Sequence, residues 1–355
     1  MKKKILISTG GSGGHVIPAM VFYDHLKEDF DIFMTVDERG SKFINHNKYK
    51  FDKLSAPRIT KEIIKIPITL ISLITSIIKF FYLLKKKKID ILIGTGGYMS
   101  FPACVAAKIL NLKIYLFEPN MLIGRANKIL LNFCNKIFCY SKEIINLPQK
   151  KRYKIILLDH LLRHEIYNLN YNQQKSEKKI NLLIIGGSQG ANFFDNELKS
   201  SIVDISKKCN LKVYHQVSDF DLSKLELFYK ENNIKNILFN FEENIYKYMS
   251  EATFAITRAG AMTLSELAYL QVPFIAIPFK YAKDNHQLYN AFFYKNNNCC
   301  WILEEKDFDR QKLTEIMKNI VDNNEDYVSK KNNLKIFSYK NNWNNINQKI
   351  INLFK

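Results

Sequence analysis

The chain has 355 residues, which at roughly 100 to 200 residues per domain predicts two domains that each bury a core. Hydrophobic residues make up 47 % and charged residues 25 %, a composition that excludes wholesale disorder and a collagen-like fibre. Subtracting 34 acidic from 53 basic residues gives a formal net charge of +19, which favours a phosphate-bearing partner: a nucleotide, a nucleic acid or an anionic lipid. The six cysteines show neither a CxxC pair nor zinc-ligand spacing, which argues against a disulfide scaffold and a zinc site.

The N-terminus begins with three lysines and an apolar run at 5–8, like a signal peptide. Glycines at 10, 11, 13 and 14 interrupt the run, so we predict a buried first strand and a cytoplasmic chain. Similar short apolar runs at 89–93 and 182–185 end in glycine and precede helical patterns. This alternation is typical of parallel sheets with helical crossovers. The predicted fold class is therefore α/β.

A polar stretch at 168–178 precedes a fresh start of the pattern at Lys179, which indicates two doubly wound domains. We expect an N-terminal domain at 1–160 and a C-terminal domain at 161–335. The remaining segment, 336–355, is expected to form terminal helices that pack back on the body.

Residues 66–84 form an apolar stretch that nearly spans a bilayer and ends in four lysines. A polar stripe runs along one side of the predicted helix, formed by Thr69, Ser72, Ser76 and Lys79. These features favour a helix that lies in a membrane interface, while an ordinary core helix and a true span are the alternatives. The residues expected to face the membrane are Ile74, Ile77, Phe80, Phe81, Lys85, Lys86, Lys87 and Lys88.

Three glycine loops, at 10–15, 94–98 and 186–191, each follow a predicted strand. Glycine lets backbone N–H groups approach a ligand, and the helix that follows points its positive end at it, so each loop is suited to a phosphate. None of the loops fits the G-x-G-x-x-G dinucleotide fingerprint or the P-loop. The sequence therefore disfavours a nicotinamide dehydrogenase and a nucleoside triphosphatase.

A further glycine turn, at 258–261, follows an apolar run at 254–257 and enters a helix that carries Glu266. A carboxylate at this place can accept hydrogen bonds from both hydroxyls of a ribose. Thr263 and Glu266 also match a T-x-x-E capping box, which stabilises a helix start without any ligand. The residues alone leave both interpretations open.

Taken together and in this order, the motifs resemble the MurG family, the N-acetylglucosaminyltransferases that make lipid II in peptidoglycan synthesis. The resemblance covers nearly the whole chain and rests on T-G-G-S-G-G-H at 9–15, G-G-Y at 96–98, E-P-N at 118–120, G-G-S-Q-G-A at 186–191, H-Q at 215–216, R-A-G-A at 258–261, S-E at 265–266, and Asp284 with Gln287. It implies a GT-B fold, in which two Rossmann-like domains face each other across a cleft. The C-terminal domain of such enzymes binds UDP-GlcNAc, and the N-terminal domain binds the lipid-linked acceptor.

The resemblance implies inverting transfer of GlcNAc to the C4 hydroxyl of MurNAc in undecaprenyl-pyrophosphoryl-MurNAc-pentapeptide. His15 is the candidate general base, and its alternative role is to position the acceptor phosphate or to brace the loop. The implied donor-binding residues are Ser12, Gly13, Gly14, Asn120, Arg163, Ser188, Gln189, Gly190, Ile245, Glu266 and Gln287. The implied acceptor- and phosphate-binding residues are Gly10, Gly11, Gly96, Gly97 and Tyr98.

The expected partners are UDP-GlcNAc, the lipid-linked acceptor and the anionic cytoplasmic face of the plasma membrane, where the chain would be peripheral, with no nucleic acid. No cofactor and no metal site are expected to be required, although a loosely bound Mg²⁺ stays open. The chain departs from the family with Phe-Glu-Pro-Asn at 117–120, Asp-His-Leu-Leu-Arg at 159–163, and His286 where a glutamine is usual. The alternatives are a UDP-GlcNAc 2-epimerase or another GT-B enzyme, and a basic membrane- or nucleic-acid-binding protein without catalysis.

Overall fold

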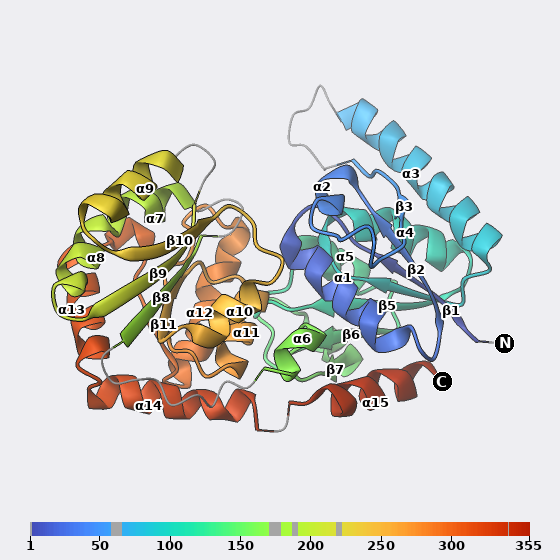
Figure 1. Cartoon of the computed structure of the whole chain (residues 1–355). Coiled ribbons are helices and arrows are strands. Elements are labelled where there is room, and N and C mark those ends of the chain that lie inside the picture. Colours follow the sequence, from blue (N-terminus) through green and yellow to red (C-terminus); the bar gives the residue numbers. More distant parts are fainter. Residues whose placement is uncertain (1, 58–65, 170–178, 187–190, 218–221, 340) are drawn as a thin grey trace. The chain divides into compact units, whose positions relative to one another are not determined.

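The computed structural model describes residues 2–57, 66–169, 179–186, 191–217, 222–339 and 341–355. Contacts divide the chain into two compact units (Figure 1). Unit 1 comprises Met1–His164 and Asn342–Lys355, and unit 2 comprises Glu165–Asn341. The chain leaves unit 1 after His164 and returns to it for its last helix.

Unit 1 is built on a seven-stranded sheet with the order β3-β2-β1-β4-β5-β6-β7, in which all described pairs are parallel. Its central strands are apolar and buried, as expected where helices cover both faces. The strands are β1 (Lys4–Ser8), β2 (Asp31–Val36), β3 (Asp52–Lys53), β4 (Ile91–Gly94), β5 (Lys113–Glu118), β6 (Lys136–Cys139) and β7 (Ile155–Leu157).

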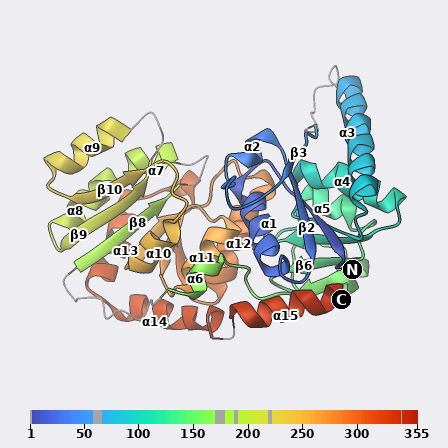
Figure 2. The same ribbon diagram turned by 45° about the vertical axis from the view of Figure 1, so that its right-hand side comes forward.

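All the helices of unit 1 except the last, α15, connect successive parallel strands, which requires each crossover to return along the sheet. They are α1 (Gly13–Leu26), α2 (Glu38–Ser41), α3 (Ile66–Lys87), α4 (Gly97–Ile109), α5 (Arg125–Leu130), the 3₁₀ turn η2 (Gln149–Lys154) and the returning helix α15 (Trp343–Phe354). Figure 2 shows α15 in red along the unit that carries α1, against which it packs. Both ends of the chain therefore lie in unit 1.

Unit 2 repeats this architecture with a six-stranded sheet in the order β10-β9-β8-β11-β12-β13, and its described pairs are again all parallel. The strands are β8 (Lys179–Ile185), β9 (Asn210–Gln216), β10 (Lys235–Phe239), β11 (Phe254–Thr257), β12 (Phe274–Ala276) and β13 (Cys300–Ile302). The predicted fold class is confirmed, because each unit is a doubly wound, Rossmann-like parallel sheet.

The helices of unit 2 cover a continuous apolar core that centres on β8, β9 and β11. Helix α6 (His164–Tyr167) lies where the chain enters the unit. The others are α7 (Ala191–Glu197), α8 (Lys199–Ser206), α9 (Leu222–Glu231), α10 (Ile245–Glu251), α11 (Ala261–Tyr269), α12 (His286–Asn296), α13 (Arg310–Val321) and α14 (Glu325–Asn333), with 3₁₀ turns η4 (Lys283–Asn285), η5 (Glu305–Asp307) and η6 (Leu334–Phe337).

Candidate active site

Each sheet has one place where the strand order reverses, and in doubly wound folds ligands bind there, beyond the carboxyl ends of the strands. In unit 1 this place lies between β1 and β4, so the loops 9–12 and 95–96 meet there. In unit 2 it lies between β8 and β11. The predicted phosphate donors Ser188, Gln189 and Gly190 follow β8 and lie outside the described residues.

His15 lies in the first turn of α1, directly after the first glycine loop, and its ring is half-buried. The ring atom Nδ1 is 2.9 Å from the carbonyl oxygen of Thr95. A carbonyl only accepts, so Nδ1 carries the hydrogen, and in the neutral ring Nε2 is then the basic atom. This tautomer suits a general base.

The same loop after β4 also lies against the His15 ring with two glycines. Gly96 and Gly97 have φ angles of 92° and 72°, a region that L side chains rarely adopt. A Cβ atom at either position would lie 3.1 to 3.2 Å from the imidazole. The two glycines that the sequence assigned to phosphate binding therefore also make room for the candidate base.

The glycine loop after β1 is held by a carboxylate that sequence analysis missed, Asp37. The N–H of Gly11 donates to Asp37 Oδ1 at 2.8 Å, and the hydroxyl of Tyr98 donates to Asp37 Oδ2. Gly11 and Tyr98, both predicted to bind the acceptor, are thus bonded to the protein itself in this structure. A signal was available, because Asp37 directly follows a buried strand and precedes a helix.

Asn120, predicted to contact the donor sugar, lies after β5 beside Glu118, which is buried at 2 % exposure. Glu118 Oε1 accepts from both the backbone N–H of Asn120 at 3.2 Å and its side-chain amide at 2.9 Å. Glu118 Oε2 accepts from Gly124 N at 2.7 Å and from Asn127 Nδ2 at 3.0 Å. One carboxylate therefore sets the conformation of the loop that presents Asn120, including its Pro119.

Arg163 lies near the end of unit 1, between β7 and α6, and is half-buried. The neighbouring His160 is buried, and burial lowers its pKa to about 4. The ring of His160 meets Tyr140 edge-on with 4.6 Å between centroids. The divergent segment at 159–163 is thus anchored by an aromatic contact of its own.

In unit 2, Glu266 lies in α11 and is 1 % exposed. Helix α11 begins at Ala261, and its N-cap is Gly260 in an extended conformation. Thr263 is therefore already inside the first turn, and the T-x-x-E capping box anticipated from the sequence is wrong. The glycine turn itself starts the helix, so Glu266 is not part of a capping box.

Gln287 lies in the first turn of α12, and Ile245 is the buried first residue of α10. Gln287 Oε1 accepts from the backbone N–H of Phe279 at 2.8 Å, so its amide nitrogen is left as the group that can donate to a sugar hydroxyl. His286 uses Nδ1 to donate to the carbonyl of Lys283 at 2.9 Å. The segment after β12 is therefore held by the side chains that the donor is expected to meet.

A buried ion pair joins the strand ends of unit 2 around these residues. Arg258, after β11, donates to Glu305 Oε2 at 2.8 Å and to the carbonyl of Ile277 at 3.1 Å. Both side chains are nearly buried, at 5 % and 7 % exposure. Burial lowers the pKa of Arg258, and the charge of Glu305 opposes that shift. The network links the ends of β11, β12 and β13.

The returning helix α15 is docked on α1 by an aromatic contact. The Trp343 ring stacks on His25 with 3.5 Å between centroids, and His164 meets the same indole edge-on at 4.6 Å. His25 Nδ1 lies 3.3 Å from Asn347 Oδ1. Burial lowers the pKa of His25 to about 4, so this histidine is neutral near pH 7.

Helix α3 lies on the outside of unit 1 and is drawn in light blue in Figure 1. Only 11 % of its most apolar window is buried, which contradicts the alternative of an ordinary core helix. Its buried side includes Ser76, whose hydroxyl donates to the carbonyls of Ser55 and Ser72. Part of the polar stripe thus faces the protein, and large apolar side chains are exposed at Ile66, Ile68, Leu70, Ile71, Ile74, Ile78 and Tyr82.

The predicted membrane-facing set needs correction at Phe80, which is fully buried in the core of unit 1. Ile77 and Phe81 are half-buried and pack against that core, whereas Ile74 is 49 % exposed. Lys85, Lys86 and Lys88 are exposed, while Lys87 Nζ lies 3.0 Å from Asp52. The helix is long and apolar enough to cross a membrane, but one such helix is weak evidence for a span.

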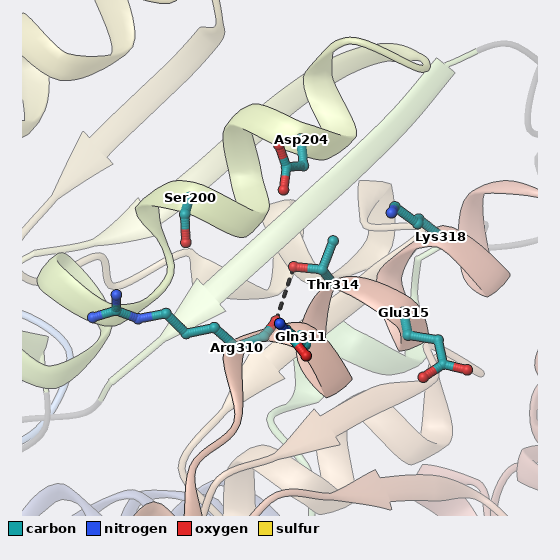
Figure 3. A pocket seen from close by; sticks show the side chains of 7 residues that line it. All are labelled: Ser200, Asp204, Arg310, Gln311, Thr314, Glu315 and Lys318. Atoms are coloured by element: carbon teal, nitrogen blue, oxygen red, sulfur yellow. Dashed lines mark hydrogen bonds between the residues drawn. The ribbon is translucent and has the colours of Figure 1, made fainter.

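A surface groove in unit 2 lies between α8 and α13 and has a volume of about 370 Å³. Figure 3 shows its lining side chains, which include Ser200, Asp204, Arg310, Gln311, Thr314, Glu315 and Lys318. Thr314 donates to the carbonyl of Arg310, and Arg310 forms an ion pair with Glu197. None of the predicted site residues lines this groove.

Comparison with known proteins assigns the chain to a family. Residues 5–139 match the glycosyltransferase family 28 N-terminal domain, and residues 181–346 match the glycosyltransferase family 28 C-terminal domain. The chain is 48 % identical over 354 residues to the UDP-N-acetylglucosamine--N-acetylmuramyl-(pentapeptide) pyrophosphoryl-undecaprenol N-acetylglucosamine transferase of Pelagibacter ubique, covering 99 % of both. The chain belongs to the MurG family.

Two further relatives are more distant in sequence. The enzyme of the same name from Rickettsia canadensis is 33 % identical over 90 % of this chain and 91 % of its own. The crystal structure of Acinetobacter baumannii MurG superposes with a TM-score of 0.75 at 19 % identity, covering 99 % of both chains. A UDP-N-acetylglucosamine 2-epimerase superposes with a TM-score of 0.62 at 13 % identity over 94 % of this chain and 91 % of its own, a likeness of fold alone.

Proposed function

We propose that this chain transfers GlcNAc from UDP-GlcNAc to the C4 hydroxyl of MurNAc in undecaprenyl-pyrophosphoryl-MurNAc-pentapeptide, converting lipid I to lipid II in peptidoglycan synthesis. The names of the relatives and the identity over nearly the whole chain support this assignment. The observation that carries it at the site is the His15 imidazole, held with Nδ1 on the Thr95 carbonyl between two glycine loops.

In the proposed reaction, His15 Nε2 takes the proton of the acceptor hydroxyl while the oxygen of that hydroxyl attacks the anomeric carbon of GlcNAc. UDP leaves from the opposite face, so the configuration inverts and the product is a β-linkage. The proton moves to a ring whose other nitrogen is already committed to Thr95, which holds the imidazole in one orientation. The protein supplies placement and a base, and no covalent intermediate is needed.

On the donor side, we assign the ribose hydroxyls to the carboxylate of Glu266 and the sugar hydroxyls to Asn120 and Gln287, with Arg163 beside the nucleotide. Backbone N–H groups at 188–190 are proposed to stabilise the charge that develops on the departing diphosphate. In this scheme no bound metal is required. Turnover that persists in excess EDTA supports this point, and turnover that is lost and then restored by Mg²⁺ contradicts it.

We further propose that the chain is peripheral on the cytoplasmic face of the membrane, held there by α3. The exposed apolar side of α3 and the lysines at its end together suit an anionic lipid surface. This placement brings a water-soluble donor and a lipid-linked acceptor to one enzyme. Nucleic acid is not proposed as a partner.

The direct test incubates purified protein with UDP-GlcNAc and a soluble lipid I analogue and follows both UDP release and the disaccharide product. We expect both to appear in equal amounts and only when the acceptor is present. An acceptor-independent conversion of UDP-GlcNAc into its 2-epimer would favour the epimerase instead. No release with an acceptor that another MurG uses would contradict the proposed function.

A further inference from the structure

The carboxylate of Asp37 occupies an unusual position for a helix N-cap. It follows β2 and caps α2 by accepting from the backbone N–H of Gly40 at 2.9 Å. An ordinary N-cap residue serves only its own helix. Here the same oxygen, Oδ1, also accepts from Gly11 N at 2.8 Å, and Oδ2 accepts from the Tyr98 hydroxyl. One side chain thus joins the loops after β1, β2 and β4.

The surrounding backbone is shaped to admit this carboxylate. A Cβ atom at Gly10 would lie 2.6 Å from Asp37 Oδ1, and one at Gly40 would lie 2.8 Å from the same oxygen. Real Cβ atoms essentially never show contacts that short, so a side chain at either position would require the carboxylate or its neighbours to shift. Asp37 itself is 7 % exposed. Glycine at these two positions thus leaves room for the Asp37 carboxylate.

Two of the loops that Asp37 joins are the loops that hold His15. Gly11 belongs to the turn that leads into the first turn of α1, where His15 lies. Tyr98 directly follows Gly97, whose backbone lies against the imidazole. A shift of either loop would therefore move the candidate base relative to the acceptor hydroxyl.

We propose that Asp37 is the positioning residue of this half of the site: its carboxylate fixes the loops after β1 and β4 and, through them, the place of His15. The proposal rests on the proposed function, because it assigns a role in the same transfer. Asp37 acts through hydrogen-bond geometry and does not touch the reacting atoms. Its loss is expected to lower kcat far more than it changes the KM for UDP-GlcNAc, because only Ser12, Gly13 and Gly14 of the implied donor-binding residues lie on a loop that Asp37 holds.

The test compares Asp37→Ala and Asp37→Asn with the wild-type chain in steady-state kinetics. For Asp37→Ala we expect kcat on the lipid I analogue to fall about 100-fold, the loss typical of a base displaced by about 1 Å, with a much smaller change in the KM for UDP-GlcNAc. Asparagine is nearly isosteric, and its oxygen can still accept from Gly11 and Gly40 while its amide meets Tyr98. Asp37→Asn should therefore recover most of kcat.

The matched control is Glu38→Gln, the neighbouring carboxylate, whose side chain is 77 % exposed and pairs with Lys53. It should keep the wild-type kcat. Wild-type kcat in Asp37→Ala, or a kcat and a donor KM that worsen together, would overturn the positioning role. An Asp37→Asn variant as slow as Asp37→Ala would overturn the geometric argument.

If circular dichroism shows that Asp37→Ala does not fold, Tyr98→Phe decides, since it removes one hydrogen bond of the carboxylate and keeps the ring. A lowered kcat with unchanged KM values for both UDP-GlcNAc and the acceptor then supports the proposal, whereas an unchanged kcat, or a loss confined to the acceptor KM, overturns it. The wild-type turnover reports separately on the proposed function. Its absence would reject that function, whereas the Asp37 series rejects only the role of this residue.

Discussion

At the scale of single residues, the candidate site of unit 1 depends on carboxylates and carbonyls that act on other residues. Thr95 selects the tautomer of His15, Asp37 bonds the loop beside it, and Glu118 sets the orientation of the Asn120 amide. Each contact leaves the polar group of the supported residue in one defined geometry. Because these side chains are already held in place, they lose less conformational entropy when a substrate binds.

His15→Asn is expected to lower kcat by roughly 10² to 10⁴-fold, the usual contribution of a general base. Asparagine can still donate to the Thr95 carbonyl, so the loop and the affinity for UDP-GlcNAc should persist. UDP release gives kcat, and titration calorimetry gives the donor affinity. The exposed His46, replaced by Asn, serves as the control. Unchanged turnover in His15→Asn would leave this histidine a bracing role and place the base elsewhere.

The sequence was sufficient to locate His15 and the glycine loops, because their determinants are local: a buried strand, a glycine turn and a helix start. It was not sufficient to find Asp37, whose partner Tyr98 lies 61 residues away. Their contact depends on β1 pairing with β2 on one side and with β4 on the other. The packing of the whole sheet decides which strands are neighbours, so a short stretch of sequence does not reveal such a contact.

At the scale of elements, the sequence pattern of α3 predicted a helix correctly but misjudged which of its side chains the protein buries. The polar stripe was expected to run along a membrane-facing helix, and the structure instead turns Ser76 toward the protein and bonds it to Ser55. Phe80 is consequently buried, and Ile71 and Ile78 are exposed. The hydroxyl of a serine or threonine in a helix can donate a hydrogen bond to a nearby backbone carbonyl, so this side chain does not have to face water. The capping box predicted at Thr263 was wrong for a different reason. The glycine turn starts the helix at Ala261, so Thr263 is not the N-cap residue.

Replacing Lys85, Lys86 and Lys88 by Gln should weaken binding to vesicles that contain anionic lipid. Each lysine near such a surface contributes about 1 kcal/mol, and salt screens the effect. Lys87 stays unchanged because it pairs with Asp52. Co-sedimentation at increasing ionic strength measures the effect, and turnover on a soluble acceptor should survive the replacement.

The charge-matched control for this triple variant replaces Lys207, Lys208 and Lys306, which are exposed in unit 2, by Gln. It removes the same charge from the chain and should sediment like the wild type. Equal loss of binding in both variants would attribute the effect to net charge. Binding of the wild type to neutral and anionic vesicles alike would reject the electrostatic part of the membrane proposal.

The Arg258–Glu305 pair ties adjacent strand ends of unit 2 and should contribute to its stability. Glu305→Gln keeps a hydrogen-bond acceptor but leaves a buried guanidinium without its counter-charge, which typically costs about 3 kcal/mol. We expect the free energy of urea unfolding of unit 2, followed through Trp301 in a Trp343→Phe background, to fall by about this amount. Glu304→Gln is the control, since its side chain is 37 % exposed and its effect should stay within about 0.5 kcal/mol. Equal midpoints for the two variants would contradict the prediction.

At the scale of the whole molecule, the buried histidines make stability depend on pH. The folded-state pKa of His25 is about 4, whereas an unfolded histidine titrates near 6.5. Between these values the unfolded chain binds more protons, so the free energy of unfolding falls as the pH drops from about 6.5 to 4. Over this pH range, proton uptake by His25 on unfolding lowers the free energy of unfolding by about 3 kcal/mol in total. His160, with the same pKa, adds to it.

His25→Gln should flatten this pH dependence, because glutamine takes up no proton in the window. Urea unfolding at several pH values, read through Trp343 in a Trp301→Phe background, follows the unit that holds the helix. The exposed His46→Gln is the control and should keep the wild-type slope. Parallel curves for wild type and His25→Gln would show that the Trp343 contact does not depend on the charge of this ring.

Unit 2 is one uninterrupted stretch of chain, whereas unit 1 needs residues from both ends. Lys3 Nζ, near the N-terminus, donates to the carbonyls of Phe354 and Lys355. On the ribosome, the sheet of unit 1 is made first but has to wait for α15, the helix that Trp343 docks on His25. Unit 2 can complete its own contacts before translation ends. The first unit to be synthesised is thus the last to be finished, and a nascent chain released early would expose the α1 surface that α15 covers.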